Sequence, residues 1–331
     1  EILMQAKVNV RRFNPDEEAP KPYNQEYQVE VDENFTVLDT LIKVREEIDG
    51  SLALRCSCRA SICGSCAIRV NGHAVLACKT RVSEHLSEDD QVSIEPAGNL
   101  PVIKDLVVDL NPFWDKIRAV EPYMQPSMPE PEAEYLAPND VMLHLVDVMG
   151  CIMCGACVSD CTVLEVDKNF LGPAALAKAY RFVADTRDVE DDKRLRMYNA
   201  YGGMWDCTRC GECVTACPKG VAPMERIMAM REKAIEAQTP TGSYDGAAYG
   251  YRHSLAFEDL VSHSGRLNET MLLVKTVGMF NLPKLIAMIP IAMNAAFRRK
   301  VPPMFHPTIP GVGQVRRIAA RINARKGEAA K

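Results

Sequence analysis

The sequence lacks a hydrophobic run long enough to cross a membrane. The apolar segment Leu285–Phe297 is 13 residues long, contains Pro290 and Asn294, and runs into three basic residues. A transmembrane helix needs about 20 predominantly apolar residues, so we expect no membrane span. The N-terminus also lacks the basic, apolar and small-residue pattern of a secretory signal, and we therefore expect a cytoplasmic location.

The sequence also lacks a recognisable catalytic or nucleic-acid-binding pattern. No acid–base or nucleophile constellation stands out, and no recognition motif accompanies the basic residues. None of the six histidines follows a Cys-x-x-Cys pair as a haem-binding histidine would. We interpret all six as structural or solvated: His73, His85, His144, His253, His263 and His306. A nucleic-acid-binding role and a haem site are therefore poor hypotheses.

Cysteine, by contrast, is abundant, with 13 residues. The spacing C-x2-C-x2-C-x3-C occurs twice and is typical of proteins with two cubane iron–sulfur clusters. In such a pair, each run gives three thiolates to one cluster and its fourth to the other. The eight cysteines are Cys151, Cys154, Cys157, Cys161, Cys207, Cys210, Cys213 and Cys217. Because metal ligands must stay reduced, the pattern predicts an electron carrier in a reducing compartment, not a disulfide-bonded chain.

The remaining five cysteines form a second group between residues 56 and 78. Cys58, Cys63 and Cys66 have the plant-type C-x4-C-x2-C spacing, and Cys78 supplies a distant fourth ligand, which predicts a [2Fe–2S] centre. Cys56 falls outside this register. We expect it to be a buried structural thiol, with ligand exchange or redox sensing as the alternative.

The first hundred residues predict strands and one helix around the cysteine loop. Alternating or β-rich segments place strands at 5–13, 26–32, 67–70, 75–78 and 91–95, with a tight Asn71-Gly72 turn between the third and the fourth. Thr36 is expected to cap a helix whose buried face carries Val37, Leu41, Val44 and Ile48. The fold class is therefore α+β, with a β-grasp [2Fe–2S] ferredoxin-like domain over residues 1–100.

The middle of the chain changes from proline-rich to helical. Seven prolines between residues 96 and 135 predict a linker over 101–137 that wraps on the surface and is not a free tether. Its apolar stretch, residues 100–108, is expected to pack. Residues 138–240 predict an all-α bicluster ferredoxin domain. Its helices are expected at 139–149, 173–186, 190–200 and 221–237. Pro218 is expected to start a helix directly after Cys217.

The last part, residues 241–331, predicts a basic, Met-rich extension. Residues 251–331 hold thirteen Lys and Arg against four Asp and Glu, a net charge of +9, which leaves −14 on residues 1–250. The Gly/Tyr-rich stretch 241–251 has low helical propensity, whereas 255–299 is expected to be helical. We expect this extension to dock on a partner subunit or a membrane surface, with a solvated basic face as the alternative.

The order of these motifs resembles that of the iron–sulfur subunits of succinate dehydrogenase and fumarate reductase. The resemblance covers about residues 5–236. It rests on the loop from Cys58 to Cys78 and on short matching stretches at 38–41, 100–109, 172–174, 179–182, 185–188 and 217–220. The combination is far more specific than any one motif.

The resemblance implies a subunit that holds no substrate and passes electrons through three clusters. A flavoprotein with FAD would interconvert succinate and fumarate, and a membrane anchor with a quinone nearby would place the subunit at the cytoplasmic face of the cell membrane. The implied ligands are Cys58, Cys63, Cys66 and Cys78 for the [2Fe–2S] cluster, Cys151, Cys154, Cys157 and Cys217 for the middle [4Fe–4S] cluster, and Cys161, Cys207 and Cys213 for the last cluster.

The sequence departs from the family pattern at the last cluster. Most members have an apolar residue where this chain has Cys210, and their last centre is [3Fe–4S]. A fourth thiolate can retain a fourth iron, so we predict a second [4Fe–4S] cluster, with [3Fe–4S] as the alternative. Thr162 and Thr208 also replace the usual proline and histidine. These departures resemble variants whose anchor is a cysteine-rich CCG-type subunit instead of a cytochrome b type.

Two alternative functions remain open. The chain could be the iron–sulfur subunit of another dehydrogenase or heterodisulfide-reductase-like complex, of the glycolate or glycerol-3-phosphate type, although those usually lack a fused [2Fe–2S] domain. It could also be a redox-inert zinc scaffold, which would be colourless. We favour the electron-transfer subunit of a succinate:quinone oxidoreductase or fumarate reductase.

Overall fold

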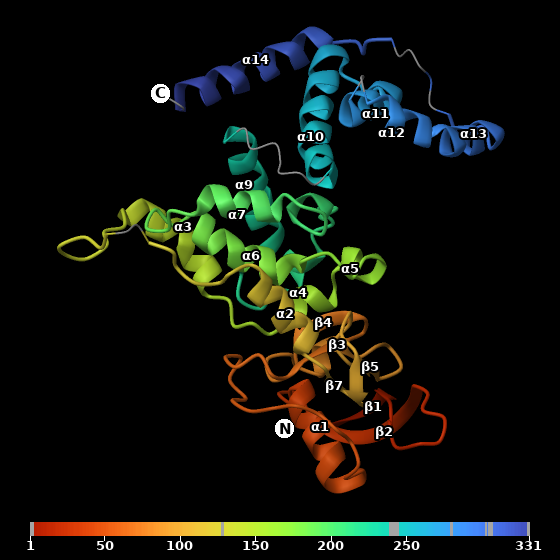
Figure 1. The fold of residues 1–331 in the computed structure, drawn as a ribbon. Helices are drawn as coiled ribbons and strands as arrows, with labels where there is room; N and C mark the ends of the chain where they lie inside the picture. The colour runs from red at the N-terminus through yellow and green to blue at the C-terminus, as the bar shows by residue number, and fades with distance from the viewer. Residues whose placement is uncertain are drawn as a thin grey trace. The chain divides into compact units, whose positions relative to one another are not determined.

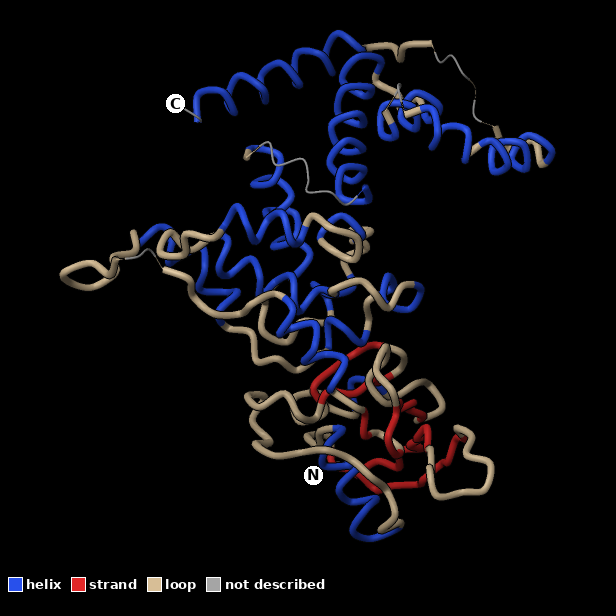
Figure 2. Tube along the Cα trace, in the orientation of Figure 1, coloured by secondary structure: helices blue, strands red, loops and turns tan. Residues whose placement is uncertain are grey.

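The computed structural model describes residues 3–126, 129–237, 245–278, 281–301, 303 and 307–329. The chain divides into two compact units, Glu1–Thr239 and Pro240–Lys331. The first unit contains a sheet at one end and packed helices at the other (Figure 1), whereas the second consists of helices and loops (Figure 2). The predicted linker and both predicted cluster domains fall within the first unit, so the boundaries between them stay predictions.

The sheet of the first unit has five strands in the order β2-β1-β5-β3-β4. The strands are β1 (Leu3–Arg12), β2 (Tyr23–Asp32), β3 (Ala67–Val70), β4 (His73–Leu76) and β5 (Gln91–Glu95). Strand β1 pairs antiparallel with β2 and parallel with β5, whereas β3 pairs antiparallel with both β4 and β5. All five predicted strands are present. Asn71 and Gly72 have φ of 49° and 85°, as the expected tight turn between β3 and β4 requires.

Helix α1 (Val37–Lys43) covers this sheet and continues into a π-helical turn at Val44–Ile48. The predicted cap is present: the Thr36 side chain accepts a hydrogen bond from the Asp39 N–H, and the Asp39 carboxylate accepts one from the Thr36 N–H. Val37, Leu41 and Val44 are buried. Ile48 is 52% exposed, so its predicted burial was wrong, because the π-helical turn changes the direction of the last side chain.

The predicted linker carries its own secondary structure. Strands β6 (Val102–Lys104) and β7 (Val107–Val108) form a hairpin, and helix α2 (Asn111–Ala119) follows. The apolar stretch packs as expected, with Leu106 and Val108 buried. Asp105, at the hairpin turn, is 1% exposed and pairs with the buried Arg12 guanidinium at 2.8 Å. The hairpin and helix α2 themselves were not predicted from the sequence.

The remainder of the first unit is helical. Its helices are α3 (Asn139–Met149), α4 (Ala156–Ser159), α5 (Thr162–Val166), α6 (Gly172–Val183), α7 (Asp191–Tyr198), α8 (Glu212–Thr215) and α9 (Pro223–Glu236). Helix α6 packs against α2, α3, α4, α7 and α9 and is the centre of this half. The four predicted long helices are present. Pro218 does not start a helix: residues 218–219 form a turn, and α9 begins at Pro223.

The second unit contains α10 (Asp245–Ser264), α11 (Glu269–Val277), α12 (Leu282–Ala287), α13 (Ile289–Phe297) and α14 (Val312–Ala329). The predicted low helicity of 241–251 was wrong from Asp245 onward, and residues 241–244 lie outside the described residues. Helix α14 was not predicted, although Val312, Val315, Ile318 and Ile322 recur at helical spacing along it. Within the described chain, no helix combines the length and apolar character that a membrane crossing demands.

Candidate metal centres

The first cysteine group lies in the loop between α1 and β3 and in the turn after β4. Backbone N–H groups point at its sulfurs: Ala60, Ile62 and Cys63 donate to Cys58 Sγ at 3.3, 3.4 and 3.3 Å, and Ser61 donates to Cys78 Sγ at 3.3 Å. Such hydrogen bonds stabilise negative charge on sulfur. The loop therefore directs its backbone N–H groups at the Cys58 and Cys78 sulfurs.

The four thiols of this group are close enough to shift one another's pKa values. Hydrogen bonding to Ser65, whose hydroxyl oxygen lies 3.1 Å away, and to Cys58 lowers the pKa of Cys63 to about 6. Burial, together with the nearby Cys78 and Cys63 sulfurs, raises the pKa of Cys66 to about 12. The pKa is thus lowered at the exposed Cys63 and raised at the buried Cys66 of the same loop.

Cys56 lies outside this group in the structure as it does in the sequence. It is half-buried and packs against the hydrophobic core of the sheet. The expected buried structural thiol is therefore only half-buried, because the chain leaves the core directly after it. Cys58 is already exposed.

The second group lines one apolar pocket. Cys151, Cys154, Cys157 and Cys217 all border it, together with Pro218 and Lys219. Burial raises the pKa of the Cys157 thiol well above its ordinary value, and the neighbouring cysteine sulfurs raise it further. Val221 donates its N–H to Cys217 Sγ at 3.4 Å. A cysteine from the second run thus lines the same pocket as three from the first.

The third group joins Cys161 to the second run. Burial raises the pKa of Cys161, and the neighbouring Cys210 and Cys207 sulfurs raise it further. Burial likewise raises the pKa of Cys213 to about 12, with Cys207, Cys161 and Cys210 as electrostatic neighbours. Cys210 is exposed, and the Thr162 hydroxyl donates to its sulfur at 3.6 Å. Cys210 therefore belongs spatially to this group and does not turn away from it.

The two runs adopt the same local backbone. Met153 and Arg209, each preceding the second cysteine of its run, have φ of 57° and 61°. Gly155 and Gly211, each following that cysteine, have φ of 79° and 87° and cap helices α4 and α8. Glycine adopts this left-handed conformation without the steric cost that a side chain brings. The repeated motif thus folds the same way twice.

The three groups are arranged in series within the first unit. A Cβ at Gly64, in the first group, would lie 2.7 Å from Cys154 Cβ, in the second. Cys157 of the second group and Cys213 of the third are electrostatic neighbours. Each group therefore adjoins the next.

Polar contacts fix the sheet against the helices that carry the second and third groups. The Arg69 guanidinium (β3) and the Ala74 N–H (β4) both donate to the Asp160 carboxylate, at 3.1 and 2.7 Å. Asn99 Nδ2 donates to the carbonyls of Val158 and Cys161, both at 2.9 Å. Sequence analysis missed these residues, because single polar side chains far apart in the chain give no local pattern.

Arg231 was also missed from the sequence. It lies on α9, 6% exposed, and its guanidinium donates to the carbonyls of Met204 and Cys207 and stacks on the Trp205 ring. Burial lowers its pKa to about 10. Within the described residues, no carboxylate lies at ion-pair distance. A buried cation needs a compensating anion, and Cys207, whose carbonyl accepts from Arg231, belongs to the adjacent four-sulfur group. An arginine on the apolar face of a predicted helix was the available signal.

The donor sets fit iron–sulfur clusters. Each group offers four sulfurs, which is the ligand number of [2Fe–2S] and [4Fe–4S] clusters. No three His, Cys, Asp or Glu side chains among the described residues are grouped as ligands of a single metal ion. A cluster spreads its thiolates over several irons, so its ligands stand farther apart.

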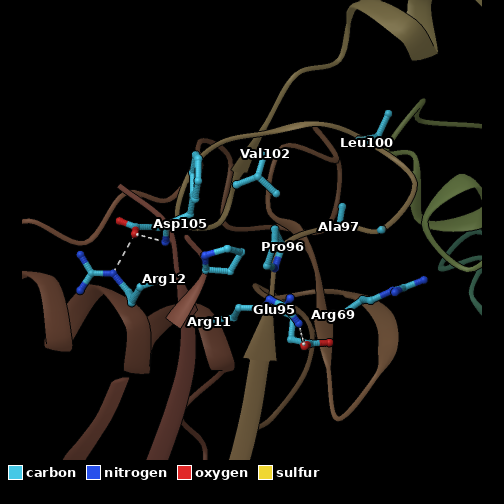
Figure 3. A pocket seen from close by; sticks show the side chains of 12 residues that line it. Arg11, Arg12, Arg69, Glu95, Pro96, Ala97, Leu100, Val102 and Asp105 are labelled. Carbon is cyan, nitrogen blue, oxygen red and sulfur yellow. Dashed lines mark hydrogen bonds and ion pairs between the residues drawn. The ribbon is translucent and has the colours of Figure 1, made fainter. Parts of the chain in front are cut away.

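A separate pocket of about 410 Å³ opens beside the sheet (Figure 3). Its charged lining side chains are paired: Arg11 with Glu95 at 3.3 Å, Arg12 with Asp105 at 2.8 Å, and Arg69 with Asp160. Figure 3 also shows Pro96, Ala97 and Leu100 along its wall. The pocket contains no cysteine and belongs to the junction between the sheet, the hairpin and the helical half.

One ferredoxin-like and two cubane-type cysteine groups in one unit define an iron–sulfur electron carrier. Residues 7–115 match the family described as a 2Fe-2S iron-sulfur cluster binding domain, and residues 147–221 match the 4Fe-4S dicluster domain. The chain belongs to the iron–sulfur subunits of the fumarate reductase and succinate dehydrogenase family. Its role is electron transfer within that class of oxidoreductase.

The relatives support this assignment over most of their length. The chain is 39% identical over 222 residues to the fumarate reductase iron-sulfur subunit of Mycobacterium tuberculosis, covering 66% of this chain and 89% of that protein. It is 34% identical over 266 residues to the 8-methylmenaquinol:fumarate reductase iron-sulfur subunit of Wolinella succinogenes, covering 78% and 81%. A chain of the Mycobacterium smegmatis Sdh1 complex in the apo form matches with TM-score 0.60 and 27% identity, covering 72% and 98%. The glycolate or glycerol-3-phosphate alternative is not favoured.

Proposed function

We propose that twelve cysteines hold three clusters in this electron-transfer subunit. Cys58, Cys63, Cys66 and Cys78 would hold a [2Fe–2S] cluster, and Cys151, Cys154, Cys157 and Cys217 a [4Fe–4S] cluster. Cys161, Cys207, Cys210 and Cys213 would hold a second [4Fe–4S] cluster. When bound, the clusters supply the one-electron centres.

One observation carries this proposal: the three groups adjoin one another in series. The first group abuts the second at Gly64 and Cys154, and the second adjoins the third at Cys157 and Cys213. A structural role for the cysteines would not require three four-sulfur groups in sequence. The order supports a path that enters at one end of the unit and leaves at the other.

The chain's own residues hold and insulate the clusters. The first group receives four backbone N–H bonds, which favour thiolates. The second lies in an apolar pocket that limits access of water. At the third, the buried Arg231 supplies positive charge. These differences would give the three sites different reduction potentials, since hydrogen bonds, charge and solvent exposure set them.

We assign the partners from the two ends of this series. The exposed Arg59 and Ile62 flank the first group and would face an FAD flavoprotein that interconverts succinate and fumarate. The third group, with the exposed Cys210, would face a membrane anchor and a quinone. The subunit would thus lie peripherally at the cytoplasmic face of the cell membrane and pass electrons between flavoprotein and anchor.

The anchor type follows from the third group. The four sulfurs of the third group support a [4Fe–4S] cluster. The resemblance links Cys210, which departs from the usual family pattern, to a cysteine-rich CCG-type anchor instead of a cytochrome b type. The basic second unit, with exposed Ile291 and Phe297 on α13, would dock on that anchor or on the membrane surface. We keep the boundaries 1–100, 101–137, 138–240 and 241–331 for the β-grasp domain, linker, bicluster domain and extension.

Iron analysis and electron paramagnetic resonance (EPR) of the air-oxidised complex test this proposal. A [2Fe–2S] and two [4Fe–4S] clusters contain about ten irons and give no oxidised-state EPR signal. Finding both would support Cys210 as a ligand. About nine irons with a strong oxidised-state [3Fe–4S] signal would contradict it and favour a quinone-linked cytochrome b type anchor.

A further inference from the structure

A threonine hydroxyl donates a hydrogen bond to one sulfur of the third cysteine group. Thr162 Oγ1 donates to Cys210 Sγ at 3.6 Å, across 48 positions of sequence. Both residues are exposed. In the described part of the chain, the Cys210 sulfur accepts no other hydrogen bond, whereas Cys58 accepts three. The Thr162 hydroxyl is thus the contact that orients the exposed Cys210 side chain.

The backbone explains why this hydroxyl is in place. Cys161 is the N-cap residue of α5 and has an extended backbone, with φ of −77° and ψ of 109°. Thr162 is the first residue of that helix, directly after a predicted ligand from the first run. Its hydroxyl reaches a predicted ligand from the second run. Thr162 therefore connects the two cysteine runs at the third group.

We propose that Thr162 is a positioning residue of the third cluster: it holds Cys210 towards the site and raises the reduction potential of the cluster. This inference rests on the proposed function, because it requires Cys210 to be a ligand. A hydrogen bond to a ligand sulfur withdraws electron density and stabilises the reduced, more negative state more than the oxidised state. Removing the donor therefore lowers the potential.

The chain provides a matched control. Thr208 follows Cys207 in the same group, is exposed, and donates no hydrogen bond to a cysteine sulfur in the described structure. Thr208→Val thus changes the same residue type at the same site without removing an O–H···S contact. Thr162→Val removes the contact at nearly constant volume, and Thr162→Ser keeps the hydroxyl.

The experiment is a redox titration of the purified complex followed by EPR, with iron analysis of every variant. We expect Thr162→Val to lower the midpoint potential of the third cluster, so that a smaller fraction is reduced at a fixed potential. Thr162→Ser should restore the original value, and Thr208→Val should leave it unchanged. The [2Fe–2S] potential should not move in any variant.

Two results would overturn the inference. One is an unchanged midpoint potential in Thr162→Val, and the other is an equal shift in Thr208→Val, which would indicate a general effect of altered polarity. Iron analysis and EPR of the unmodified complex test the proposed function separately. If it contains about nine irons and a [3Fe–4S] signal, Cys210 is not a ligand and both proposals fail; ten irons with no effect of Thr162→Val sink only the positioning role.

Discussion

Gly64 and Cys154 are in direct contact across the boundary between the first and second cysteine groups. A Cβ at Gly64 would lie 2.7 Å from Cys154 Cβ and 2.8 Å from its Cα. Real Cβ atoms do not approach other atoms so closely, because overlapping electron shells repel strongly below the contact distance. The absence of a side chain at residue 64 therefore sets how closely the two cluster loops approach.

Gly64→Ala should disturb both loops. Gly64 has φ of +74°, so alanine there adopts an unfavourable conformation at a cost of about 1 kcal/mol and also clashes with Cys154. We expect this variant to contain less iron than the unmodified protein. On heating, it should lose its cluster absorbance at a lower temperature. Gly72→Ala is the control, because Gly72 also has positive φ, of +85°, but no atom within 4 Å of the added Cβ. Equal effects of the two substitutions would refute a role for the close approach.

Cys210→Ser should convert the third cluster. Removing the fourth sulfur leaves Cys161, Cys207 and Cys213, a ligand set for three irons. Iron content should fall from about ten to about nine per subunit, and an oxidised-state EPR signal should appear. Cys56→Ser should change neither quantity, since Cys56 lies against the sheet core, outside all three groups. Iron loss from Cys56→Ser of the same size would reassign the ligands.

Asp188→Ala should destabilise the helical half strongly. Asp188 accepts two hydrogen bonds from Arg194, at 2.9 and 3.2 Å, and both side chains are fully buried. Removing one partner of a buried pair costs about 3–5 kcal/mol, because the other charge stays buried. We expect a clear fall in the urea midpoint.

Asp115→Ala provides the matched comparison for this effect. Its carboxylate pairs with Arg118 at 2.8 Å, but the two side chains are 72% and 69% exposed. Exposed pairs contribute about 0–1 kcal/mol, so the urea midpoint should hardly move. A similar loss in both variants would show that burial does not determine the strength of the Asp188 pair.

The Asp49 carboxylate should make stability depend on pH. Hydrogen bonds from Ser51, Tyr27 and Arg12 hold the pKa of Asp49 well below its usual range. A folded pKa below the unfolded value of about 3.9 contributes stability above that pH, and the contribution disappears as pH falls towards the folded pKa. The thermal midpoint of Asp49→Asn should therefore lie below that of the unmodified protein at pH 6.

This difference in thermal midpoint should narrow as the pH is lowered below about 4. Comparing the two proteins at each pH removes any effect of acid that they share, such as loss of clusters. A difference that stays constant from pH 6 to pH 3 would show that ionisation of Asp49 does not contribute.

Local patterns predicted the regular elements well, because period and capping act within a few residues. Thr36 and Asp39 form the expected reciprocal cap, and the Asn71-Gly72 turn has the expected positive φ at both residues. The prediction failed where a neighbouring segment decides the conformation. Pro218 lies in a turn because the chain must first place Cys217 in the second group, and α9 begins five residues later.

By itself the sequence predicted the number of cysteine groups and the members of each, because ligand spacing is a local property. Only the tertiary structure decided the contacts between segments far apart in the chain. It brings Gly64 against Cys154, leaves Arg231 buried beside the third group, and joins Thr162 to Cys210. The sequence marks Thr162 and Cys210 as two separate departures from the family pattern. Their contact exists only because helix α5 and the second cysteine run pack together, which no local pattern encodes.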